Sequence, residues 1–232
     1  MGNIDINAVY NAVIKRLHWA DAILISAGPG MASAEGYKMM ADTDDYKKYF
    51  GEFREKYQVT GIYQALFAPM TTDDKARFRE QLRKYLVDDY EGSEVYRNLK
   101  KLMTFKPYFV VTSNGDRHFQ MNGFEEESIY EIEGNFFGLE KESPEWLAQK
   151  QRFRDFLQAH EGKNILQLEF GIKASNKTVK APLMLIVSKN PNMRYVTFNT
   201  AKEISIRIDI MDRSLAVPGR IADALKILDV LY

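Results

Sequence analysis

The sequence predicts an α/β fold, with a mostly parallel sheet covered by helices on both faces and a small inserted helical module. Short continuous apolar runs, such as 21–26 and 108–112, are typical of strands that are buried on both faces. Segments with helical spacing of apolar residues separate most of these runs, which indicates parallel strands joined by helices. A long, heavily charged block with helical spacing, residues 37–103, lies between the first two runs.

The composition excludes several classes of protein. The chain has 232 residues, of which 45% are hydrophobic and 28% charged, as in ordinary soluble proteins. Lys+Arg and Asp+Glu both number 32, so the basic excess typical of nucleic-acid binders is absent and we expect no nucleic-acid partner. The sequence has no apolar run of bilayer length and no signal-peptide pattern, so we expect no membrane association. The absence of cysteine excludes cysteine-ligated zinc and fits a cytoplasmic location.

The expected elements follow in order along the chain. Residues 5–19 predict a helix capped by Asp5 or Asn7, and 21–26 predict the first strand. Four candidate helices follow in the charged block, at 44–57, 60–67, 71–86 and 92–105. Further strands are predicted at 108–112, 128–134, 164–171, 182–189, 193–200 and 204–210, and further helices at 145–160 and 217–231. We therefore expect a Rossmann-like core formed by 1–36 and 104–232, and a helical module formed by 37–103.

The first strand runs into a loop with almost no side chains, AGPGMASAEG. Gly28 and Gly30 would let a pyrophosphate approach the backbone at the start of a helix, which is the first half of a dinucleotide-binding fingerprint. The third glycine of that fingerprint is replaced by Ser33, which disfavours an ordinary dehydrogenase. A tight strand-to-helix turn without a ligand is the alternative interpretation.

A second polar motif, TSNGDRHFQMNGF, follows the strand at 108–112. Asn114 and Asp116 lie just after the carboxyl end of this strand, where open α/β sheets bind their ligands. The same composition is also typical of a simple turn. His118 lies within the motif, and it is either an acid or base near the site or a solvent-facing helix residue.

The order of these motifs resembles the sirtuin family over roughly residues 20–230. Gly28-Pro29-Gly30 stands where sirtuins have Gly-Ala-Gly, and Met31 and Ala32 take the places of Ile and Ser. The T-x-N-x-D motif of the family is matched by Thr112, Asn114 and Asp116, followed by Gly123. Glu131 to Gly134 matches the segment E-L-H-G, Gly171 begins a loop in the place of the family's G-T-S loop, and Asn199 ends a later strand as in the family.

The resemblance implies NAD as the cofactor. The four zinc cysteines of the family are absent here, so we expect no zinc. It implies that NAD contacts Ala27, Gly28, Gly30, Met31, Ala32, Ser113, Asn114, Asp116, Gly171 and Asn199. In this assignment the glycine loop takes the pyrophosphate, and Gly171 and Asn199 meet the adenosine half. Asn114, Asp116 and Glu133 surround the nicotinamide ribose as the catalytic residues, and Asp116 holds the nicotinamide amide.

The sequence departs from the family at the catalytic histidine, which is Glu133 here. Deacetylation is therefore disfavoured. The pattern is closest to the class M sirtuins, which implies ADP-ribosyl transfer to a protein acceptor, such as a lipoyl-carrier protein, with a macrodomain as partner. A carboxylate can stabilise the positive charge that develops on a ribose during cleavage, so Glu133 suits ADP-ribosyl transfer to a protein or to water.

Two further expectations remain open. The alternative function is a catalytically inactive sensor or scaffold that binds NAD or ADP-ribose, in which Glu133 is only a surface residue at a strand end. The three histidines lack the spacing of metal ligands, so we expect no metal site.

Overall fold

The computed structural model describes residues 6–232, so the proposed cap Asp5 lies outside the described residues. The core is a six-stranded sheet with the order β3-β2-β1-β4-β5-β6, and every neighbouring pair is parallel. The strands are β1 (Ala22–Ala27), β2 (Tyr108–Thr112), β3 (Ile129–Glu131), β4 (Ile165–Phe170), β5 (Met193–Asn199) and β6 (Ser214–Pro218). This arrangement confirms the Rossmann-like α/β fold that the sequence predicts.

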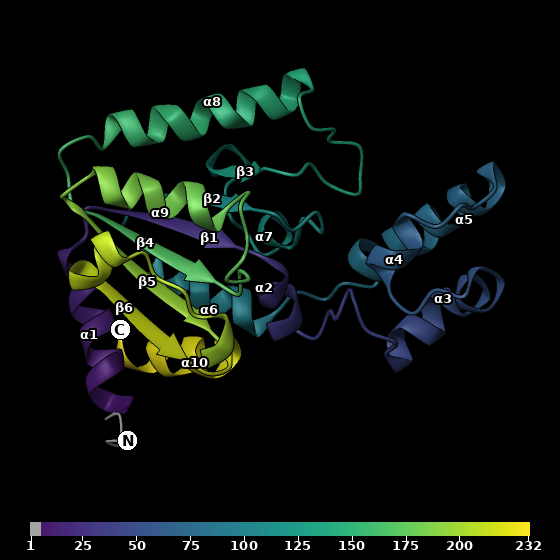
Figure 1. The fold of residues 1–232 in the computed structure, drawn as a ribbon, viewed down its shortest axis with the longest axis horizontal. Coiled ribbons are helices and arrows are strands. Elements are labelled where there is room, and N and C mark those ends of the chain that lie inside the picture. The colour runs from purple at the N-terminus through teal and green to yellow at the C-terminus, as the bar shows by residue number, and fades with distance from the viewer. Residues whose placement is uncertain (1–5) are drawn as a thin grey trace.

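Helices cover both faces of the sheet (Figure 1). The α-helices are α1 (Ile6–Trp19), α2 (Pro29–Ala34), α3 (Asp44–Tyr57), α4 (Ile62–Leu66), α5 (Thr72–Arg83), α6 (Glu94–Leu102), α7 (His118–Met121), α8 (Pro144–Ala159), α9 (Lys180–Lys189) and α10 (Ile221–Leu231). Helices α1, α6 and α10 pack on one face, and α8 and α9 pack on the other. Within residues 6–232, no helix combines the length and the apolar character that a bilayer span requires.

Strand β1 shows why the apolar runs are continuous. Ile23 and Ile25 pack with α1 and α10, whereas Leu24 packs on the opposite face with the cluster that contains α9. Since successive side chains of a strand point to opposite faces, a central strand of a two-sided sheet is apolar on both faces at most positions.

Two of the predicted strands are wrong. Residues 182–189 form most of helix α9, in which Leu183 and Val187 are buried four residues apart on one face. Pro182 is tolerated because it stands in the first turn, where no intrahelical N–H is needed. The Asn176 side chain accepts hydrogen bonds from the backbone amides that precede this helix, those of Thr178, Val179 and Lys180.

The second error concerns 204–210, which is not a strand. Its end forms part of a short 3₁₀ segment, Ile208–Arg213, in which Ile208 is exposed and Ile210 is buried. The edge strand β6 follows at Ser214–Pro218, so Val217 and Pro218 belong to it and not to the last helix. Helix α10 begins only at Ile221, because Gly219 adopts a φ of +138°, which interrupts helical geometry.

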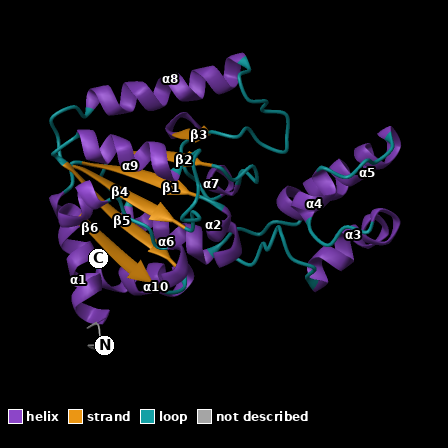
Figure 2. Cartoon of the chain, in the orientation of Figure 1, coloured by secondary structure: helices purple, strands orange, loops and turns teal. Residues whose placement is uncertain are grey.

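The inserted helices form a separate packing unit (Figure 2). Tyr46, Phe50 and Phe53 of α3 pack against Phe78 and Leu82 of α5 in a core that is distinct from the two clusters on the sheet. Helix α6 differs, because its buried residues belong to the cluster beneath the sheet, beside α10. We therefore propose that the module spans 37–93 and that α6 belongs to the Rossmann-like core.

Candidate functional site

Three cavities follow one another along the carboxyl edge of the sheet. The β5 cavity, of about 610 Å³, lies between α2 and the ends of β5 and β6. The bridging cavity, of about 350 Å³, shares Gly30, Ser33 and Asn199 with it. The module cavity, of about 580 Å³, shares Pro29, Met40 and Lys173 with the bridging cavity. Shared walls make the three cavities parts of one groove, at the edge where open α/β sheets bind ligands.

The glycines of the first loop are required by close packing between two loops. A Cβ atom on Gly30 would lie 2.5 Å from the Cα atom of Gly171, and the Gly30 N–H donates to the Gly171 carbonyl at 3.0 Å. Gly171 itself has a φ of +62°, a conformation that favours glycine. Tight loop geometry therefore explains these glycines without a ligand, while Ser33 contributes an exposed hydroxyl to the same wall.

Other residues predicted on this loop are placed with their side chains inside the protein. Ala27, Met31 and Ala32 are buried, and Met31 packs in the cluster beneath the sheet. These three residues can therefore meet a ligand only through their backbone. The side chains that face the bridging cavity come instead from its walls, and they include the lysines Lys38 and Lys173.

Asn114 is the most informative residue of the second motif. It is only 4% exposed, and its side-chain partner among the described residues is the buried Tyr96 hydroxyl, with which it makes no hydrogen bond of good geometry. Its backbone N–H donates to the Thr112 hydroxyl at 3.0 Å, which fixes the start of the loop. Buried polar groups are nearly always paired, so an amide without a hydrogen bond of good geometry at the edge of the sheet indicates a contact with a bound molecule.

Asp116 and His118 lie together behind this loop. The Asp116 carboxylate is buried and accepts the backbone N–H of His118 at 3.0 Å. The His118 ring is completely buried, with Nδ1 2.5 Å from Glu35 Oε1 and Nε2 2.9 Å from the Leu86 carbonyl. A solvent-facing His118 is therefore excluded.

Glu133 lies at the floor of the module cavity with Ser113, Gly134 and Asn135. Its side chain is 40% exposed, and the ammonium group of Lys141 lies 3.5 Å from its carboxylate. The outer wall of this cavity is apolar and comes mainly from the module, through Tyr63, Leu66 and the exposed Phe67. The predicted catalytic residue thus faces a cavity that is open to a large partner.

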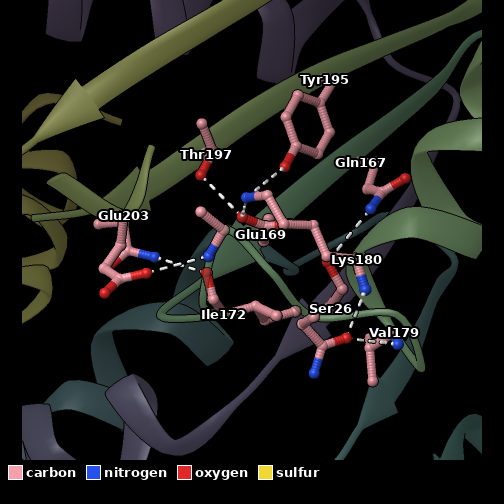
Figure 3. Close-up of polar contacts among 12 residues, drawn as sticks. Ser26, Gln167, Glu169, Ile172, Val179, Lys180, Tyr195, Thr197 and Glu203 are labelled. Atoms are coloured by element: carbon pink, nitrogen blue, oxygen red, sulfur yellow. Dashed lines mark hydrogen bonds and ion pairs between the residues drawn. The ribbon is translucent and has the colours of Figure 1, made fainter. Parts of the chain in front are cut away.

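The loop after β4, residues 171–179, is held in place at several points (Figure 3). The Asn199 amide donates to the Ile172 carbonyl at 2.8 Å, and Glu203 accepts the Ala174 N–H at 3.0 Å. Beneath the loop, Lys180 and Glu169 form a completely buried ion pair at 2.5 Å, and the Thr197 hydroxyl donates to the same carboxylate oxygen at 2.9 Å. Asn199 therefore lines the groove while its amide supports this loop.

One group in the described part of the chain has the composition of a metal site. Carboxylate and imidazole atoms of Glu35, Asp116 and His118 lie within 4.8 Å of one another. Both ring nitrogens of His118 already have oxygen partners, Glu35 and the Leu86 carbonyl. The group is therefore better described as an ion pair beside a carboxylate, and the absence of a metal stays a prediction.

Glu35 is the residue that sequence reasoning missed. It follows α2 in a stretch of small residues, and its side chain is only 1% exposed. Its partner His118 lies 83 residues away in the sequence. The only feature of the sequence that pointed to Glu35 was its position as a single carboxylate directly after the small-residue loop. No local pattern could identify its partner.

The chain was compared with known proteins. No family model matches the sequence. A protein named protein ADP-ribosyltransferase from Staphylococcus aureus (strain Mu50 / ATCC 700699) is 23% identical over 253 residues, which cover 84% of this chain and 79% of that protein.

Solved structures give a second comparison. A structure concerned with sirtuin substrate affinity matches with a TM-score of 0.59 and 14% identity, over 94% of this chain and 96% of that one. A Sir2 homologue in complex with NAD matches with a TM-score of 0.58 and 10% identity, over 95% of this chain and 93% of that one. A Sir2 mutant with a p53 peptide and NAD gives a TM-score of 0.56 and 14% identity, over 94% and 96% of the two chains. The chain therefore has the Rossmann-like α/β fold of the Sir2 sirtuins.

Proposed function

We propose that the protein binds NAD along the groove, cleaves the nicotinamide–ribose bond and passes ADP-ribose to a protein acceptor or to water. The observation that carries this proposal is the buried amide of Asn114, which has no hydrogen bond of good geometry and stands in the sequence between Ser113 and Gly115 of the module cavity. The name of the staphylococcal relative and the NAD complexes among the structures of the same fold support the same chemistry.

The residues of the groove fit the parts of NAD. The bridging cavity presents Lys38 and Lys173 from opposite segments, and ammonium groups suit a pyrophosphate. Gly30 and the hydroxyl of Ser33 complete that wall, whereas Gly28 is buried and lines none of the three cavities. The β5 cavity, beside Gly171 and Asn199, takes the adenosine half.

The catalytic residues act at the opposite end of the groove. NAD supplies an ADP-ribosyl group that is already joined to a good leaving group, nicotinamide. The Glu133 carboxylate stabilises the positive charge that develops on the ribose, Asn114 orients the ribose, and Asp116 holds the carboxamide of nicotinamide. In the resemblance to sirtuins, Glu133 stands where deacetylating members have histidine, so we propose no deacetylation.

The acceptor enters through the module cavity. Its rim carries the exposed side chains of Met40 and Phe67, and Phe136 contributes to the opposite wall. Such a rim suits contact with another protein. A lipoyl-carrier protein as acceptor and a macrodomain as partner stay predictions from the resemblance, as does the cytoplasmic location.

The proposal is tested by measuring nicotinamide release from NAD by chromatography. We expect release by the wild-type protein, loss of at least about a hundredfold in Glu133→Ala, and little change in Glu140→Ala. Glu140 is the matched control, because it is an exposed glutamate on the same loop that does not line the module cavity. Equal release by the wild type and Glu133→Ala would remove the carboxylate from the mechanism.

The alternative function is an NAD or ADP-ribose sensor without turnover. The observation in its favour is that the Glu133 side chain is 40% exposed and lies near Lys141. Water and the ammonium group both screen the electrostatic interaction of this carboxylate with a bound ligand. Binding of NAD without nicotinamide release, with or without an acceptor protein, would support the sensor and refute the transferase.

A further inference from the structure

We propose that Glu35 and His118 form a positioning pair that holds Asp116 in place and couples the helical module to the groove. The inference rests on the proposed function in one respect only, which is the expected effect of the pair on NAD binding. The pair itself is a feature of the described structure, and its parts come from three segments that surround the groove.

The first step is the geometry of the pair. The side chains of His118 and Glu35 are 0% and 1% exposed, and Nδ1 lies 2.5 Å from Oε1. The second ring nitrogen, Nε2, lies 2.9 Å from the Leu86 carbonyl. Since both ring nitrogens face oxygen acceptors, the arrangement is satisfied when both carry a proton and the ring is an imidazolium.

The second step is what the pair connects. Glu35 directly follows α2, the helix that begins in the glycine loop. His118 is the first residue of α7, and its N–H donates to the Asp116 carboxylate. Leu86 belongs to a short π-helical segment, Lys84–Asp88, through which the chain leaves the module. One imidazole ring therefore contacts the glycine-loop helix, the second motif and the module exit.

Tyr90 and Asn122 reinforce this connection. The Tyr90 ring stacks on His118 with 3.9 Å between ring centroids, and its hydroxyl donates to Glu35 Oε2 at 2.8 Å. The Asn122 amide donates to the Tyr90 hydroxyl and to the His118 carbonyl, both at 2.7 Å. Both carboxylate oxygens of Glu35 therefore have a hydrogen-bond partner, and the His118 ring cannot rotate without breaking these contacts.

The charge of the pair depends on pH. Burial opposes the imidazolium, but the hydrogen bond to Glu35 and the negative charge of Asp116 outweigh it, so the pKa of His118 is raised above its usual 6.5. Burial also raises the pKa of Glu35, although the hydrogen bond to His118 opposes this. The titratable groups that face the ring are Glu35, Asp116, Tyr37, Tyr90 and Tyr96. As pH rises through the raised pKa, the ring loses one proton, so one of its nitrogens then faces an oxygen acceptor without a proton and the connection weakens.

The first test uses the ligand-free protein and hydrogen exchange. We expect Glu35→Gln to accelerate amide exchange about tenfold in residues 28–37, 84–93 and 114–124 together, since all three segments depend on one contact. The matched control is Glu126→Gln, which removes the exposed ion pair with Arg117 on the same motif and should leave exchange unchanged. Unchanged exchange in Glu35→Gln, or acceleration in only one segment, would overturn the coupling.

The second test needs no stable variant. The ring resonances of His118 in the wild-type protein, assigned through the backbone, should titrate above 6.5. The protection factors of the amides in the three segments, which are corrected for the pH dependence of intrinsic exchange, should fall over the same pH interval. A titration at or below 6.5, or one without a change in exchange, contradicts the pair.

The third test connects the pair to the groove. Titration with NAD should show about tenfold weaker binding to Glu35→Gln than to the wild type, and wild-type affinity should fall as His118 deprotonates. Binding within about twofold of the wild type would show that the pair does not position the site. A wild type that binds no NAD would refute the proposed function instead, and hydrogen exchange would still decide the coupling.

Discussion

Two buried ion pairs differ in the segments of the chain that they join. Lys180–Glu169 and His118–Glu35 have the same 2.5 Å separation between charged atoms, and all four side chains are essentially inaccessible to water. The first pair joins residues 11 positions apart, on a strand and the helix that follows it. The second joins residues 83 positions apart and contacts the module exit at the Leu86 carbonyl.

The comparison shows that burial and distance alone do not define the role of an ion pair. Lys180–Glu169 joins a strand to the helix that follows it, so it stabilises the loop between them. A histidine can lose its charge near neutral pH, so His118–Glu35 can respond to the environment. Removing one partner of a buried ion pair leaves the other charge buried and unpaired, which lowers the free energy of unfolding. The size of this loss in each pair measures how much the pair contributes to stability.

The largest effect is expected from Lys180→Ala. This change leaves the Glu169 carboxylate buried without its ammonium partner, so the free energy of unfolding should fall by about 3–5 kcal/mol. Urea unfolding at neutral pH measures the loss. Lys189→Ala, at the exposed end of the same helix, is the control and should change little. A loss below about 1 kcal/mol for Lys180→Ala would mean that the buried pair is replaceable by a neutral arrangement.

The pH dependence of Glu35→Gln sharpens the comparison. The raised pKa of His118 means that its contribution to stability is complete below pH 6.5 and is lost as pH rises through the folded-state pKa. The raised pKa of Glu35 has the same sign. We therefore expect a destabilisation of about 2 kcal/mol near pH 6 that shrinks toward pH 9, measured by urea unfolding at each pH. A destabilisation by Glu35→Gln that is the same at pH 6 and at pH 9 would contradict this pH dependence.

A smaller effect is expected from Tyr90→Phe. The ring stacking on His118 remains, but the hydroxyl that donates to Glu35 and accepts from Asn122 is removed. The free energy of unfolding should fall by about 1 kcal/mol, as for a single buried hydrogen bond. Tyr232→Phe, at the chain end, provides the comparison. A change equal to that of Glu35→Gln would show that the hydroxyl, and not the ion pair, holds the segments together.

The smallest effect is expected from Glu126→Gln. The ion pair of Glu126 with Arg117 has a 3.0 Å separation, but the glutamate side chain is 61% exposed. Water and salt screen such a pair, so its loss should change the free energy of unfolding by less than about 0.5 kcal/mol. If Glu126→Gln lowered the free energy of unfolding as much as Glu35→Gln, the charge on the motif would contribute more to stability than the burial of the ion pair.

The sequence was sufficient for the central strands because a two-sided parallel sheet requires apolar residues at most positions. Mostly apolar runs appear at 22–27, 108–112 and 165–170, the last interrupted by Gln167 and Glu169, and the structure places strands there. The same signal failed at 182–189, because a short apolar run is compatible with a buried helix as well as a strand. It failed at 204–210 because alternating isoleucines can also line an irregular edge segment.

For the site, the sequence by itself placed Asn114 and Asp116 at a strand end and Glu133 at the end of the next strand. Those positions follow from strand order, since the carboxyl ends of parallel strands meet at one edge. Only the tertiary structure decided that Gly30 packs on Gly171 and that Glu35 meets His118. Both contacts join segments far apart in the chain, and their energies depend on burial and on the exact approach of two surfaces, which no local pattern of residues encodes.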